Sequence, residues 1–363
     1  MGACAATPDF VPSDLSWPAD FRLFSLHAHL TRWEIDGQPR LANNEGMPGL
    51  AIEIENLTKE YPFGFLHLRK KTSLEGLNMQ VEAGEVFGFI GPNGAGKSTT
   101  IKLLMGLIFP TVGNARILGK PISDVEMHRD IGYLPEQPYF YDYLTAAEVL
   151  DYFARFHDLS GTDRRGRVER MLKKVGLETA RKIQLRKYSK GMLQRVGLAQ
   201  AILHDPKLVI LDEPMSGLDP VGRREVRDII LELKREGKTV MFSTHILSDA
   251  ETLCDRVGVI VGGKLRGVGA PGTLVDMKTQ GMEIQFELTG TSAAPLLSKA
   301  TRTGEYYRLP VAEEELYGAI EQLRTAGARI LSVSQVKATL EEFFMHLVEA
   351  DRAQAAAVEV SGK

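Results

Sequence analysis

The residues with the clearest chemical purpose lie in the segment Gly91-Pro92-Asn93-Gly94-Ala95-Gly96-Lys97-Ser98. This spacing is the pattern G-x-x-x-x-G-K-[ST], which is typical of a phosphate-binding loop. The glycines let backbone N–H groups approach phosphate oxygens, and a following helix presents its unpaired N–H groups to the same anion. We expect Lys97 to reach the β- and γ-phosphates and the Ser98 hydroxyl to bind Mg²⁺. All eight residues and the adjoining Thr99 are candidate nucleotide-binding residues.

Two acidic residues, Asp212 and Glu213, follow the apolar run Leu208–Leu211. Four apolar residues in a row indicate a buried strand, and ligands of open α/β sheets bind at the carboxyl ends of the strands. We therefore expect Asp212 to act on Mg²⁺ through water. The side chain of Glu213 takes the other direction and faces an attacking water as general base. The plainer alternative is a pair of solvated carboxylates at a strand end, which the phosphate-binding loop makes less favourable.

Strands and helices alternate around these residues. Short apolar runs of the kind found in a covered, mostly parallel sheet occur at Val86–Ile90, Leu208–Leu211, Val240–Phe242 and Val257–Val261. An alternating strand is expected at Ala51–Leu57 and a helix from Lys97 to Leu107. Thr145 and Glu148 form a capping-box pair at the start of a helical region that we expect over residues 138–205. The prediction is an α/β fold with a mixed, mostly parallel sheet over residues 50–275.

A second unit begins near Gly281. Residues 282–288 alternate between apolar and polar, which predicts a half-buried strand, and an amphipathic helix over 316–323 is stopped by Gly327. Another strand is expected over 330–336, followed by a last helix that Thr339 and Glu342 cap. We interpret residues 281–350 as a small α+β domain with an antiparallel sheet and 351–363 as a frayed tail.

Composition narrows the functional classes. The chain has 363 residues, enough for about two domains. Its 44 basic and 47 acidic residues give a net charge of −3, which does not favour binding to nucleic acid. Only two cysteines, Cys4 and Cys254, are present, so a disulfide framework is excluded. No run approaches 18 apolar residues, and the first residues lack the features of a secretory signal. Five prolines within residues 1–49 predict a loosely ordered extension without a catalytic role.

The segment Tyr188-Ser189-Lys190-Gly191-Met192 resembles the signature, usually LSGGQ, of the ATP-binding cassette (ABC) family. Ser189 and Gly191 match it, whereas the other three residues depart from the commonest form. Other motifs follow in the family's order. Ser216-Gly217-Leu218-Asp219 resembles the D-loop, His245 resembles the switch histidine at the γ-phosphate, and Tyr61 resembles the aromatic residue that stacks on adenine.

The family's Q-loop glutamine, which senses Mg²⁺ and the γ-phosphate, has two candidate counterparts here, Glu136 and Gln137. The sequence does not decide between them. A cluster of aromatic residues follows at Tyr139, Phe140, Tyr141 and Tyr143. This cluster is either local packing or, as the resemblance implies, a groove that receives a short helix of a membrane partner.

The resemblance implies an ATPase subunit that works as a head-to-tail dimer, with ATP and Mg²⁺ held between the phosphate-binding loop of one copy and the signature of the other. A separate transmembrane permease is its implied partner, and the cytoplasmic face of the membrane its location. The small C-terminal domain is similar to that of cassette proteins serving ABC-2-type exporters. The alternative is a soluble ABC-type ATPase acting on a machine such as the ribosome. A P-loop kinase or GTPase does not account for Ser189, Gly191 and His245.

Overall fold

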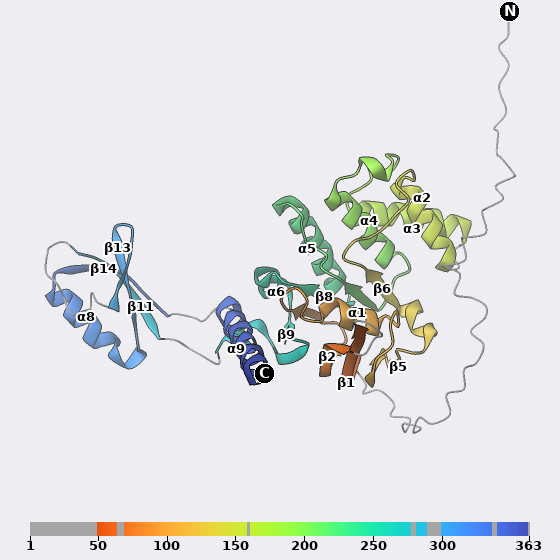
Figure 1. Cartoon of the computed structure of the whole chain (residues 1–363). Coiled ribbons are helices and arrows are strands. Elements are labelled where there is room, and N and C mark those ends of the chain that lie inside the picture. The colour runs from red at the N-terminus through yellow and green to blue at the C-terminus, as the bar shows by residue number, and fades with distance from the viewer. Residues whose placement is uncertain are drawn as a thin grey trace, which may run out of the picture. The chain divides into compact units, whose positions relative to one another are not determined.

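The structure, a computed structural model, describes residues 49–63, 69–157, 160–276, 281–288, 299–335 and 340–361. The N-terminal extension expected over residues 1–49 lies outside the described residues except for Gly49. The predicted helix cap Thr339 and the strand residue Val336 also lie outside them. Figure 1 shows the arrangement of the elements.

The main sheet has six strands in the order β10-β9-β3-β8-β7-β6. Their bounds are Val86–Ile90 for β3, Ile131–Leu134 for β6, Leu208–Leu211 for β7, Thr239–Thr244 for β8, Arg256–Val261 for β9 and Lys264–Gly269 for β10. All neighbours pair in parallel except β10, which is antiparallel to β9. The prediction of a mixed, mostly parallel sheet is confirmed.

Strand order brings the motifs together. β8 lies between β3 and β7, with Ile90 opposite Thr244 and Leu211 opposite Phe242. Because parallel strands end at the same edge, the phosphate-binding loop after β3, the acidic pair after β7 and His245 after β8 emerge side by side.

Both faces of this sheet are covered. In β7, Leu208 and Ile210 belong to one core cluster and Val209 and Leu211 to the other. The first cluster joins α1 (Lys97–Leu104) to an antiparallel sheet of order β2-β1-β4-β5. The strands of that sheet are β1 (Leu50–Phe63), β2 (Arg69–Glu82), β4 (Val112–Ile117) and β5 (Lys120–Pro121). Burial on both faces explains why these short strands are apolar throughout.

Helices cover the second face. They are α2 (Ala146–Ala154), α3 (Gly161–Lys174), α4 (Lys190–Ile202), α5 (Pro220–Arg235) and α6 (Leu247–Leu253), with short 3-10 segments at Arg155–His157 and Leu185–Lys187. A further 3-10 segment, Val125–Asp130, packs its Met127 into the core of the first face. The capping box of Thr145 and Glu148 is present at α2, and Ser189 caps α4 by accepting the N–H of Met192. Asp219 caps α5 at Gly222 N, with Pro220 in the first turn. These polar caps fix where each helix begins.

The C-terminal unit has an antiparallel sheet of order β12-β13-β11-β14. Its elements are β11 (Met282–Leu288), β12 (Thr301–Thr303), β13 (Tyr306–Val311), a 3-10 turn at Glu313–Glu315, α8 (Leu316–Thr325) and β14 (Ala328–Gln335). Ile284 and Phe286 of β11 and Leu323 of α8 share a small separate core. The predicted α+β arrangement with an antiparallel sheet is therefore confirmed.

The last helix differs from its prediction. α9 runs from Leu340 to Ser361, through the segment from residue 351 that the sequence predicts as a tail. Alanine has the highest helix propensity, so the alanine-rich segment extends the helix. Leu340 and Val348 of α9, together with Leu274 of α7 (Pro271–Asp276), join the core at β9 and α6, not the core of the small sheet. Arg266 and Asp351 form an ion pair in the same region.

No helix in the described ranges is long and apolar enough to cross a membrane.

Candidate functional site

The phosphate-binding loop leaves the N-terminus of α1 open. Gly96 is the N-cap residue with φ of 109° and no side-chain cap, and Gly94 has φ of 80°. The first turn of α1 carries no acidic residue. A Cβ on Gly96 would lie 2.7 Å from the carbonyl oxygen of Ser73, and one on Gly91 would lie 2.5 Å from that of Ile260. The glycines are thus required by backbone conformation and by close packing, and the free N–H groups suit an anion.

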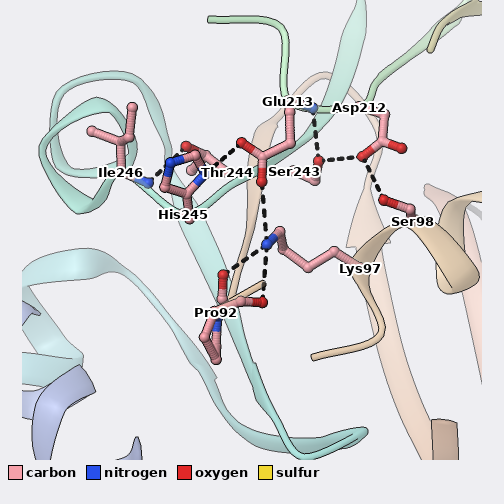
Figure 2. Close-up of polar contacts among 10 residues, drawn as sticks. Pro92, Lys97, Ser98, Asp212, Glu213, Ser243, Thr244, His245 and Ile246 are labelled. Carbon is pink, nitrogen blue, oxygen red and sulfur yellow. Dashed lines mark hydrogen bonds and ion pairs between the residues drawn. The ribbon is translucent and has the colours of Figure 1, made fainter. Parts of the chain in front are cut away.

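Lys97 is buried, and its ammonium group contacts three oxygen atoms of the chain. Its side chain is 5% exposed, and its Nζ donates to the carbonyl oxygens of Gly91 at 2.7 Å and Pro92 at 3.2 Å. The same Nζ lies 3.2 Å from Oε1 of Glu213 (Figure 2). The ammonium group therefore already faces a carboxylate where the loop is open to a phosphate.

The carboxylate of Asp212 accepts hydrogen bonds from two hydroxyl groups. The Oγ atoms of Ser243 and Ser98 donate to its Oδ1 at 2.7 Å and 3.3 Å. The residue is only 3% exposed. Burial, together with the charge of Asp212, raises the pKa of nearby Tyr133 on β6 to about 12. The phenol of Tyr133 therefore stays neutral beside the acidic residue.

Glu213 turns away from Asp212. Its φ of 48° is in the left-handed region, which is unusual for a residue other than glycine. Its N–H donates to Ser243 Oγ at 2.8 Å, and its Oε2 lies 2.8 Å from Nδ1 of His245 (Figure 2). Glu213 therefore lies between Lys97 on one side and His245 on the other.

These side chains surround a cavity of about 590 Å³. The sequence-predicted residues that line it are Tyr61, Asn93, Gly94, Gly96, Lys97, Ser98, Thr99, Glu136, Glu213 and His245. The structure therefore brings together residues of β1, of the phosphate-binding loop and of the segments that follow β6, β7 and β8. Glu136 lines the cavity and Gln137 does not, which favours Glu136 as the Q-loop counterpart.

Gly91, Pro92, Ala95 and Asp212 adjoin the cavity without lining it, and three further candidate residues lie on other elements. Ser189 and Gly191, at the start of α4, and Asp219, at the start of α5, are not among the lining residues. The D-loop lies close to the start of α4, since a Cβ on Gly217 would clash with Nζ of Lys190 and one on Gly191 would lie 3.8 Å from Cδ2 of Leu218. The signature and Asp219 thus form a second group within the chain, whereas Ser216, the first residue of the D-loop, lines the cavity.

Several residues at the cavity were missed by sequence reasoning. Lys71, Thr72 and Ser73 of β2 line the cavity, and the hydroxyls of Ser73 and Thr99 lie 2.9 Å apart. Nothing in the local pattern of β2 distinguishes them, because their role depends on a long-range contact with the loop. Ser243 was also missed, although it directly precedes Thr244 and His245, and its only signal was that position.

Comparisons with known proteins agree with this geometry. The family model described as "ABC transporter" matches residues 74–216. An uncharacterized ABC transporter ATP-binding protein of Synechocystis is 42% identical over 301 residues, covering 81% of this chain and 83% of the relative. The bacitracin transport ATP-binding protein BcrA of Bacillus licheniformis is 43% identical over 217 residues, 59% of this chain and 68% of that protein.

Among solved structures, a dimeric bacterial ABC transporter cassette aligns with a TM-score of 0.56 and 28% identity, over 60% of this chain and 98% of the other. Sheet order, phosphate-binding loop and sequence similarity together define an ATPase cassette of the P-loop class. The chain belongs to the ABC transporter ATP-binding proteins. It is an ATP-binding subunit that hydrolyses ATP.

Proposed function

We propose that this chain is the ATPase subunit of a multi-chain exporter of the ABC-2 type, bound at the cytoplasmic face of the membrane to a separate permease. The observation that carries the proposal is the Lys97–Glu213–His245 cluster at an open phosphate loop, with the signature placed away from it. The small antiparallel domain after the cassette, and a relative named for bacitracin transport, favour the exporter class.

ATP binding is assigned to the cavity. The N–H groups of Gly94 and of Gly96 through Thr99 would surround the phosphates, and Lys97 would exchange its contact with Glu213 for the β- and γ-phosphate oxygens. Tyr61 is 37% exposed at the rim of the cavity, with Lys59 Nζ 5.3 Å from its ring centroid. An exposed aromatic face at this place suits stacking on adenine.

The donor set fits Mg²⁺. Ser98 Oγ and the Asp212 carboxylate are hard oxygen donors 3.3 Å apart, and magnesium in nucleotide sites takes one or two such groups together with phosphate oxygens and water. Ser98 would hold the ion directly, Asp212 through water, and Glu136 would approach from the Q-loop. When bound, the ion neutralises charge on the phosphates.

Hydrolysis is assigned to Glu213 and His245. Release of Glu213 from Lys97 leaves its carboxylate free to accept a proton from a water that attacks the γ-phosphorus as ADP departs. His245, held by Glu213 at 2.8 Å, would donate to a γ-phosphate oxygen. Positioning and electrostatic stabilisation supply most of the catalysis.

A second copy completes each site. Ser189 and Gly191 leave the N-terminus of α4 available to an anion, and Asp219 marks the adjoining D-loop, yet these residues lie outside the cavity of their own chain. In a head-to-tail dimer they would close the partner's nucleotide site. The dimeric cassette among the structural relatives supports this arrangement.

The permease contact is assigned to the aromatic cluster after β6. Tyr139 is 91% exposed and Tyr143 53%, whereas Phe140 packs against the helical core. Exposed aromatic side chains anchored in this way suit the apolar face of a partner helix. The other candidate, a soluble ATPase acting on a machine such as the ribosome, has no comparable supporting feature.

Affinity purification from detergent-solubilised membranes tests the proposal. The wild-type chain is expected to recover a protein with several membrane-spanning helices, and Tyr139→Ala with Tyr143→Ala is expected to lose it. The matched control Tyr317→Ala removes an 83% exposed tyrosine from α8. Recovery of ribosomal proteins in place of a membrane protein would contradict the exporter assignment.

A further inference from the structure

Ser243 lies in β8 with no exposed surface, in contact with both acidic residues of the site. We propose that Ser243 is a positioning residue for ATP hydrolysis, which holds the carboxylate of Asp212 and the backbone of Glu213 through one hydroxyl group. The inference rests on the proposed roles of these two residues. It assigns a function to a side chain that the sequence pattern did not distinguish.

The first contact orients Asp212. Ser243 Oγ donates to Oδ1 at 2.7 Å, and Ser98 Oγ donates to the same oxygen at 3.3 Å. Two donors on one oxygen fix the rotation of the carboxylate about its Cβ–Cγ bond. When Ser98 turns to a metal ion, the hydrogen bond from Ser243 remains, so the orientation of Asp212 persists through nucleotide binding.

The second contact holds Glu213. Its N–H donates to Ser243 Oγ at 2.8 Å while its φ is 48°. A left-handed conformation at a residue other than glycine persists only where surrounding contacts enforce it. This conformation turns the Glu213 side chain toward Lys97 and His245, so the hydrogen bond sets the direction of the proposed general base.

A hydroxyl group meets both requirements because it donates one hydrogen bond and accepts another. Figure 2 shows Ser243 between the backbone nitrogen of Glu213 and the carboxylate of Asp212. Alanine would leave a buried N–H without an acceptor and a buried carboxylate with one donor fewer. Since β8 ends at Thr244 and His245 follows directly, the contacts to the acidic pair and the proposed switch histidine both come from the same end of this strand.

Ser243→Ala tests the inference by steady-state kinetics. Loss of such an orienting contact costs about 10- to 100-fold in activity or metal affinity. We expect kcat to fall by that factor, the Mg²⁺ concentration for half-maximal rate to rise, and the KM for ATP to stay within about threefold. Ser243→Thr keeps the hydroxyl and is expected to restore most of the rate.

Thr239→Val is the matched control. Thr239 is another buried hydroxyl residue of β8. Its Oγ1 accepts the backbone N–H of Gly84 at 2.8 Å, and it lies at the end of the strand away from the site. Both variants remove one buried hydroxyl contact to an amide, so a purely structural role for Ser243 would lower kcat equally in both. That result, or a Ser243→Ala rate within about twofold of wild type, would overturn the inference.

Asp212→Asn and Glu213→Gln are measured in parallel. If either of them turns over at the wild-type rate, the proposed roles fail, and the inference fails with them. If both are inactive while Ser243→Ala is normal, only the inference about Ser243 is wrong. The kcat values of Ser243→Ala and Thr239→Val are compared at equal concentrations of folded protein. A folding defect therefore cannot account for a difference in kcat between them.

Discussion

Nζ of Lys97 and Oε1 of Glu213 lie 3.2 Å apart, and both side chains are at most 8% exposed. The proposed phosphate-binding cation and the proposed general base are thus paired with each other. In the proposed mechanism, a phosphate at the loop would replace the carboxylate at Lys97 and free Glu213 to accept a proton. Binding of nucleotide would then be coupled to release of the base.

Glu213→Gln is expected to bind ATP and to stop turnover. The amide cannot accept the proton of the attacking water, and general-base catalysis contributes about 10²- to 10⁴-fold. Phosphate release under single-turnover conditions measures the loss, and a fluorescent ATP analogue measures binding. Glu321→Gln, on the exposed side of α8, is the control. An unchanged rate in Glu213→Gln removes this residue from the mechanism.

Gly96→Ala is expected to abolish nucleotide binding. The new Cβ would meet the Ser73 carbonyl oxygen at 2.7 Å, and φ of 109° is unfavourable for any other residue. Strain of this kind costs about 1–3 kcal/mol, in addition to the loss of the loop's shape. Gly119→Ala introduces positive-φ strain at 78° with no atom within 4 Å of its Cβ. Thermal unfolding measures the loss of stability in both variants, and ATP titration measures the loss of binding, which is expected only in Gly96→Ala. Tight ATP binding by Gly96→Ala would contradict the assignment of the loop.

The stability of the fold is expected to fall in acid partly because of His204. Burial, with the nearby ring of His157, lowers the pKa of His204 from 6.5 to about 4. The two rings stack with centroids 4.1 Å apart, Arg167 and Asp130 lie nearby, and Nε2 contacts Ile131 O at 3.0 Å.

Between these two pKa values the unfolded chain binds a proton at His204 that the folded chain does not. The contribution to stability is therefore complete above pH 6.5 and is lost as the pH falls toward 4. His204→Gln is expected to flatten the decline of the unfolding temperature over this range. A variant with the same slope as wild type would show that another group is responsible.

The parts of the site that are built from residues close together in the chain could be predicted from the local sequence. The loop glycines, the caps Ser189 and Asp219 and the strand before Asp212 are encoded within a few residues each. The wholly apolar strands predicted a covered sheet because burial on both faces leaves no polar position.

Contacts between distant segments were not predictable in this way. Ser243 acquires its contacts only when β8 pairs beside β7, and Ser73 only when β2 packs against the phosphate loop. The amphipathic pattern of α9 predicted a helix but not which core it would join. Its Leu340 and Val348 pack at β9, far from it in sequence.

Light scattering of Glu213→Gln with ATP and Mg²⁺ tests the central claim most directly. The chain of 40.1 kDa is expected to double its mass only when both are present, because each copy completes the other's site. Glu213→Gln combined with Ser189→Arg should bind ATP and remain monomeric, since the arginine blocks the start of α4. A Glu213→Gln protein that stays monomeric with ATP and Mg²⁺, also beside its permease, would contradict the account.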